Sequence, residues 1–180
     1  MASNTKSADR PGIRVGSVSE FSLFFRVIPG HGDAIRQAIH DLQASPGYRP
    51  GDYNVPISSI HEARFVMFDD DTRLLFATSF DGSWDAYIDD FAMSTLTGFD
   101  AIFRHTDGYG GLPDVAAVKA FILGAQVTAD GYARNYPGSV KEIRKAERTN
   151  AAFQRVLDDP AAAEALSHPA LAPLLAEAAD

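Results

Sequence analysis

The chain has 180 residues, of which 46% are hydrophobic and 22% charged, and its net charge is −8. This length fits one domain with a conventional core, and the acidic balance argues against nucleic acid as a partner. Because there is no cysteine, disulfides, thiolate nucleophiles and metal sites built on sulfur are excluded.

The first 17 residues are polar, with glycine and proline among them, so a flexible tail is predicted there. They show no apolar run of the kind that a secretory signal needs. No later stretch reaches the roughly 20 apolar residues of a membrane-spanning helix. We therefore expect a cytoplasmic protein with no membrane partner.

Residues 20–28 predict a strand rich in aromatic and β-branched residues. Both of its faces are largely apolar, which predicts a central strand covered on both sides. The breaker cluster Pro29–Asp33 leads into a helix over 34–45, with Ile35, Ile39 and Leu42 on one apolar stripe. Residues 46–59 follow as a long loop whose role the sequence leaves open.

Residues 59–80 predict a hairpin, because two apolar runs flank the short polar turn Asp69–Thr72. The turn Asp81–Trp84 then opens a helix, for which Ser83 is a suitable N-cap. This helix is expected to extend, with a weak point at Gly98, toward Phe103. One face of it is apolar and is formed by Trp84, Tyr87, Ile88 and Phe91.

A glycine-rich turn ends that helix, and residues 114–126 predict another short one. Residues 127–137 have strand character as far as Pro137. Residues 139–159 predict an amphipathic helix that opens with a capping box of Ser139 and Glu142. The alanine-rich remainder is divided into short helical pieces by Pro169 and Pro173.

The resulting order is β-α-β-β-α-(α)-β-α, which predicts an α+β fold: a ferredoxin-like sheet with an inserted helix and a C-terminal helical extension. The predicted segments are a flexible tail over 1–17, a ferredoxin-like domain over 18–159 and an Ala/Pro-rich helical tail over 160–180. Helices cover only one face of such a sheet, so a homodimer is predicted to cover the other. The apolar face on which this prediction was based contains Phe21, Phe25, Phe65 and Phe76.

The segment FSLFFRVIPGHGDAIRQAIHDL, a strand followed by a Pro-Gly turn and an amphipathic helix, resembles the dimeric α/β-barrel superfamily. In that superfamily, two ferredoxin-like sheets pair across a two-fold axis and enclose a pocket on each side. Residues 60–91 are similar to the centre of a poorly characterised bacterial branch, and the resemblance covers roughly residues 19–157. Its motifs are a His-x-x-Arg strand, an Asp-Gly turn and a later His-x-x-Gly-Tyr, which here are His61, Arg64, Asp81, Gly82, His105, Gly108 and Tyr109.

The Asp81-Gly82 turn also resembles half of the Gly-x-x-Asp-Gly turn that lies beside haem in dye-decolorising peroxidases. Position 78 is threonine instead of the first glycine, and those enzymes contain two ferredoxin-like units. The first expectation is therefore that no cofactor is bound. The partial resemblance implies haem as the alternative, with His105 or His61 as the axial ligand.

Three residues are predicted to be catalytic: His61, Asp81 and His105. Asp81 ends a strand, where it could accept a proton or merely bond the amides of its own turn. His105 is near Asp107, and a histidine paired with a carboxylate is typical of an oriented base or an axial ligand. The position of His105 after a helix equally suits an interaction with the helix dipole. For His61, a pocket role and a packing role are both open.

Five residues are predicted to contact a substrate, each with a structural alternative. Arg64 is three positions from His61 on the same strand, so the two side chains should point to opposite faces. Its alternative is a buried ion pair with Glu62. The other four are aromatic and belong either to a pocket or to the core: Trp84, Tyr87, Tyr109 and Tyr132.

Three functions are compatible with these residues. The first is a small-molecule enzyme that acts on an apolar or aromatic substrate by cofactor-independent oxygenation, cyclisation or isomerisation, with a His or Asp abstracting a proton. The second is a haem-binding, peroxidase-like protein. The third is a non-catalytic ligand-binding or accessory module.

Overall fold

The structure is a computed structural model and describes residues 12–94 and 96–179. The chain forms two compact units, Met1–Val140 and Lys141–Asp180. The first unit ends at Val140, whereas the predicted domain extends to residue 159; the predicted domain limits stay a prediction. Val140 opens the long helix α5 (Val140–Leu157) and is the buried residue of that helix.

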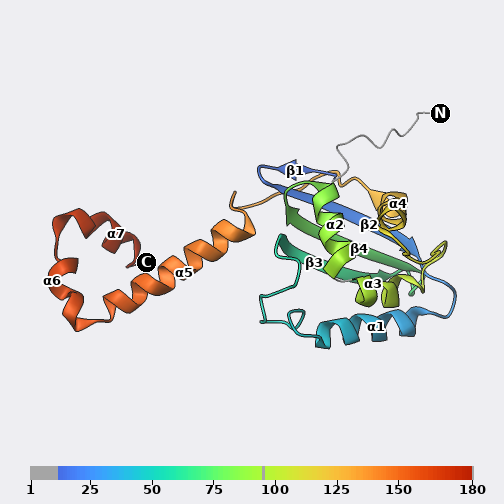
Figure 1. The fold of residues 1–180 in the computed structure, drawn as a ribbon, viewed down its shortest axis with the longest axis horizontal. Coiled ribbons are helices and arrows are strands. Elements are labelled where there is room, and N and C mark those ends of the chain that lie inside the picture. The colour runs from blue at the N-terminus through green and yellow to red at the C-terminus, as the bar shows by residue number, and fades with distance from the viewer. Residues whose placement is uncertain (1–11, 95, 180) are drawn as a thin grey trace. The chain divides into compact units, whose positions relative to one another are not determined.

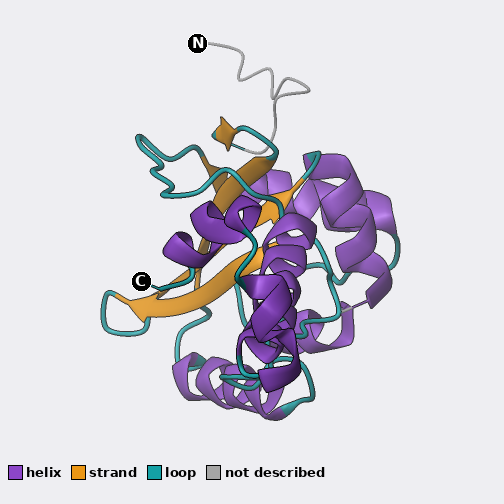
Figure 2. Cartoon of the chain, turned by 90° about the vertical axis from the view of Figure 1, so that its left-hand side faces the viewer, coloured by secondary structure: helices purple, strands orange, loops and turns teal. Residues whose placement is uncertain are grey.

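The first unit is an α+β structure built on an antiparallel sheet (Figure 1). Its central strand β2 pairs with β4 on one side and with β1 and β5 on the other, while β3 pairs with β4 at the edge. Figure 2 shows these strands in orange as one sheet. The predicted central strand and the predicted hairpin are confirmed. In the described residues the strands are β1 (Arg14–Val15), β2 (Val18–Arg26), β3 (Ile60–Phe68), β4 (Arg73–Asp81) and β5 (Gln126–Val127).

The helices of the first unit pack on one face of this sheet. They are α1 (Gly32–Ala44), α2 (Trp84–Ser94), α3 (Leu96–Phe103) and α4 (Val115–Ala125). Helices α1 and α3 lie side by side (Figure 1), and they approach closely because Gly98 has no side chain. A Cβ atom at Gly98 would lie only 3.0 Å from Leu42 Cδ1.

The core lies between these helices and the sheet. Phe21 and Phe25 of β2, Phe76 of β4 and Phe65 of β3 all belong to it, with Phe65 partly buried at its margin. Helix α4 contributes Phe121, whose ring stacks on that of Phe25 at a centroid distance of 5.1 Å. The apolar face that suggested a partner subunit is therefore covered by the helices of the same chain.

The opposite face of the sheet carries a smaller apolar group. Leu75 on β4 is paired with Phe24 on β2 and with Val66 on β3, so the three side chains share one face. The ring of Phe68, on the same face, contacts the ring of Phe24 edge-on at 6.3 Å. Val66 is 41% exposed and the other three are half-buried. We call these four residues the outer-face patch.

Three predicted elements differ from the structure. Part of the predicted flexible tail forms β1, which pairs with the start of β2; residues 1–11 of that tail lie outside the described residues. The strand predicted over 127–137 is reduced to β5, because Asp130-Gly131 and Pro137 prevent a continuous ladder. The helix predicted as far as Phe103 is replaced by two helices, α2 and α3; residue 95 lies outside the described residues.

The second unit is helical. It contains most of α5, followed by short helical pieces, as predicted. Pro169 lies in the first turn of one piece and Pro173 in the first turn of another. The pieces are η1 (Pro160–Ala162), α6 (Ala163–Leu166), η2 (Pro169–Leu171) and α7 (Ala172–Glu177).

Candidate functional site

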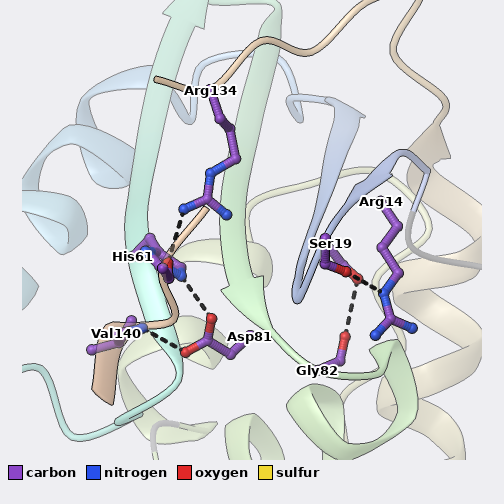
Figure 3. Close-up of polar contacts among 9 residues, drawn as sticks. Arg14, Ser19, His61, Asp81, Gly82, Arg134 and Val140 are labelled. Carbon is purple, nitrogen blue, oxygen red and sulfur yellow. Dashed lines mark hydrogen bonds and ion pairs between the residues drawn. The ribbon is translucent and has the colours of Figure 1, made fainter. Parts of the chain in front are cut away.

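The ends of β3 and β4 bring His61 and Asp81 together. The His61 Nε2 atom lies 2.8 Å from Asp81 Oδ1 (Figure 3). The β3–β4 register shifts between Ile60 and Glu62, so His61 is the extra residue of a β-bulge and has no partner in the ladder. Bulges change the direction of a side chain. This one explains how an imidazole on one strand reaches a carboxylate at the end of the next.

Asp81 is held on its other side as well. Its Oδ2 atom accepts a hydrogen bond of 2.8 Å from the backbone N–H of Val140, the last residue of the first unit (Figure 3). The backbone N–H of Asp81 donates to the carbonyl of Ser59 at 2.8 Å. The carboxylate is therefore fixed at both oxygens. The prediction that it would bond only the amides of its own turn is wrong, because the amide that it binds is 59 residues away in the sequence.

The turn after Asp81 is held by several hydrogen bonds. Gly82 has φ +86°, a conformation that glycine adopts without strain. Its N–H donates to the carbonyl of Ser17, and its own carbonyl accepts from the hydroxyl of Ser19 (Figure 3). Ser83 Oγ accepts from the N–H of Ala86 at 3.3 Å, which confirms the predicted N-cap. The turn thus places the acid on one side and starts α2 on the other.

The histidine and aspartate are partly shielded from water: 11% of the His61 side chain and 21% of the Asp81 side chain are exposed. When Asp81 accepts the Nε2 proton, the lone pair of His61 is on Nδ1, and this nitrogen can then take a proton from another molecule. A carboxylate that fixes one imidazole nitrogen and leaves the other as a base is the arrangement of an oriented general base. The role of His61 as a haem ligand stays a prediction.

The predicted pairing of His105 with Asp107 is not found. The Nδ1 atom of His105 instead lies 3.1 Å from Nδ1 of His31, and the two rings meet edge to face. Burial, followed by the nearby His31 and Arg104, lowers the pKa of His105. Sequence reasoning missed His31, which had been assigned only to a breaker cluster. The role of His105 as a haem ligand stays a prediction.

Trp84 and Tyr87 are core residues, each 2% exposed, as in the structural alternative, and their contact with a substrate stays a prediction. The indole N–H of Trp84 donates to Gln126 Oε1 at 3.0 Å. The hydroxyl of Tyr87 shares a buried hydrogen bond of 3.1 Å with that of Thr78. Burial raises the pKa of the Tyr87 phenol well above its ordinary value, so this hydroxyl remains protonated and structural.

The other predicted contact residues are dispersed. Arg64 and Glu62 are both exposed, so they form no buried ion pair. The Tyr109 hydroxyl donates to Asp100, which also binds Arg104, and burial together with Asp100 raises the pKa of Tyr109. Tyr132 is half-buried in the irregular segment between β5 and α5. The structure therefore unites two of the predicted site residues, His61 and Asp81, and separates the rest.

A cavity of about 790 Å³ lies at the opposite end of the β2–β4 pair from His61 and Asp81. Arg26 and Arg73, which are cross-strand partners, line it together with four aspartates from the surrounding turns. None of the predicted site residues lines this cavity. The four aspartates are Asp33, Asp70, Asp71 and Asp107.

Comparison of the chain with protein-family models, with curated proteins and with solved structures found no match. Within residues 12–94 and 96–179, no group of three or more His, Asp or Glu side chains is arranged to hold a metal ion. In the same part of the chain, no helix combines the length and the apolar character needed to cross a membrane.

Proposed function

We propose that the first unit is a ferredoxin-like domain that pairs into a homodimeric α/β barrel. The strand order β5-β2-β4-β3 and the helices on one face support this proposal. The outer-face patch is the surface through which the sheets would pair, because it is apolar and partly exposed. It is a small patch, and pairing would bury the four side chains that water now reaches.

Light scattering at micromolar concentration tests the pairing. We expect the mass of a dimer for the natural chain and the mass of a monomer for Val66→Lys. Val115→Lys is the matched control, because Val115 is 39% exposed, close to the 41% of Val66, but lies on α4. A monomeric mass for the natural chain, or a dimer that survives Val66→Lys, would contradict the proposed interface.

For the activity, we propose an enzyme that acts on a small apolar or aromatic molecule without a cofactor. The observation that carries this proposal is the 2.8 Å contact between His61 Nε2 and Asp81 Oδ1, with Asp81 fixed in turn by the N–H of Val140. His61 is the general base, and Asp81 is the positioning residue. Proton abstraction from an acidic C–H or O–H group is the step that such a pair performs. Oxygenation, cyclisation or isomerisation would follow from the resulting anion.

The experiment has two stages. Phenols, hydroxyquinones and aromatic ketones are first screened by NMR for compounds that shift the imidazole signals of His61. Compounds that bind are then incubated with the protein, and their conversion is followed by chromatography and oxygen uptake. His61→Ala should abolish conversion, whereas His40→Ala should not, because 78% of the His40 side chain is exposed on α1. Equal conversion by His61→Ala would refute the assignment of the base.

A further inference from the structure

His31 and His105 form a histidine pair and lie in two loops that are connected by backbone hydrogen bonds. His31 directly precedes α1, and His105 follows the last residues of α3. Both are tied to Ile28: the N–H of Ile28 donates to the carbonyl of His105, and the N–H of His31 donates to the carbonyl of Ile28, each at 3.0 Å. The two imidazoles are therefore held opposite each other by main-chain contacts and not by their own attraction alone.

The distance between the two facing nitrogens suits a metal ion. With zinc–nitrogen bonds of about 2.0–2.1 Å, two ligand nitrogens lie roughly 3.3–3.4 Å apart at a tetrahedral ion and about 2.8–3.0 Å apart at a right angle. The Nδ1 atoms of His31 and His105 are 3.1 Å apart, between these limits. The ring planes are inclined at 68°, so the rings do not stack and each can present its nitrogen edge.

The exposure of the pair also suits a metal ion. Both residues are half-buried, so they are partly desolvated but still open to an ion from solvent.

We propose that His31 and His105 form a binding site for a divalent transition-metal ion, such as Zn²⁺ or Co²⁺, with both Nδ1 atoms as ligands. No third His, Asp or Glu of the described residues completes the set, so water or a small ligand takes the remaining positions. With two protein ligands the ion is expected to exchange with solvent, whereas a structural zinc site is closed by four protein ligands. The cavity of about 790 Å³ begins beside the pair, since Gly30 and Gly32 flank His31 and line it.

Titration of the full chain with metal tests this site. After treatment with EDTA, the protein is titrated with ZnCl₂ by calorimetry and with CoCl₂ by visible absorption. We expect one ion per chain and a Co²⁺ spectrum of nitrogen ligation. His31→Ala and His105→Ala should each lose both signals. His40→Ala, on the exposed side of α1, should retain both.

A second measurement keeps the result decisive if a variant does not fold. The chain has five histidines, and their imidazole signals in the natural protein can be followed by NMR as Zn²⁺ is added. The signals of His31 and His105 should shift together at one equivalent. The proposal is overturned if Zn²⁺ does not bind, if binding survives both substitutions, or if the shifts occur at His40, His61 or His168 instead.

Discussion

Replacing Asp81 by Asn should separate the chemistry of the site from its stability. The Asn side chain has the same shape, and its amide oxygen can still accept the N–H of Val140. Its NH₂ group then faces His61 Nε2, where the carboxylate accepted a proton before. His61 must therefore accept at Nε2 and carry its proton on Nδ1, so the nitrogen that should act as the base is blocked.

The expected magnitudes follow from these contacts. Two charge-assisted hydrogen bonds become neutral ones, and the site is partly exposed, so Asp81→Asn should lower the free energy of unfolding by about 1 kcal/mol or less. Asp81→Ala also leaves the N–H of Val140 without an acceptor, and Val140 is only 8% exposed. That variant should lose about 1–3 kcal/mol. Loss of the base should reduce turnover by a factor on the order of 10²–10⁴ in both variants.

Urea unfolding gives the stabilities, turnover of the compounds identified by the NMR screen gives the activities, and nitrogen chemical shifts of His61 report its tautomer. The reasoning fails if Asp81→Asn keeps full turnover. It also fails if this variant is destabilised as much as Asp81→Ala, because Asp81 would then serve only to fix the chain.

Ser83→Ala should cost about 0.5–2 kcal/mol in urea unfolding, because it removes the N-cap bond to Ala86; an unchanged midpoint would show that the cap contributes nothing. Tyr87→Phe should cost about 0.5–1.5 kcal/mol, since the hydroxyl of Thr78 keeps its bond to the carbonyl of Glu62 but loses the buried bond to Tyr87; a stabilised variant would contradict this reasoning. Burial raises the pKa of the Glu20 carboxyl against the lowering effect of its backbone hydrogen bond, so the folded state takes up a proton before the unfolded state does. The natural chain should therefore gain stability relative to Glu20→Gln as the pH falls from about 7 toward the ordinary Glu pKa. If the urea midpoint of the natural chain instead falls relative to that of Glu20→Gln over this range, the pKa of Glu20 is not raised.

The elements of the first unit were predictable where long apolar runs were bounded by turn residues. Residues 20–28, with both faces largely apolar, predicted a central strand, and the apolar runs on either side of Asp69–Thr72 predicted the β3–β4 hairpin. The strand near residue 127 was less predictable, because its two paired residues are set by contact with Ser22 and Leu23 of β2. Aromatic content alone made residues 127–137 look like a full strand.

The candidate site was predictable in its members more than in its arrangement. His61 and Asp81 were both predicted, but their contact depends on a β-bulge for which the sequence gives no signal. His31 was missed because a histidine between two glycines favours a turn, and only the folded chain brings it to His105. For Trp84 and Tyr87 the sequence left core and pocket both open, because core and pocket walls use the same aromatic side chains; their burial in the folded chain places both in the core.

The order of the strands has a consequence for the folding rate and for the nascent chain. The β3–β4 hairpin is local and closes through Asp69, Asp70 and Asp71, which all have positive φ, so it can form as soon as it is synthesised. The partners Val18 and Asp81 of β2 and β4 are 63 positions apart, and contacts of such separation form slowly. β2 leaves the ribosome before β4, so its phenylalanines stay exposed until β4 has been synthesised. During synthesis, the strand at the centre of the finished core is therefore the segment most in need of protection from aggregation.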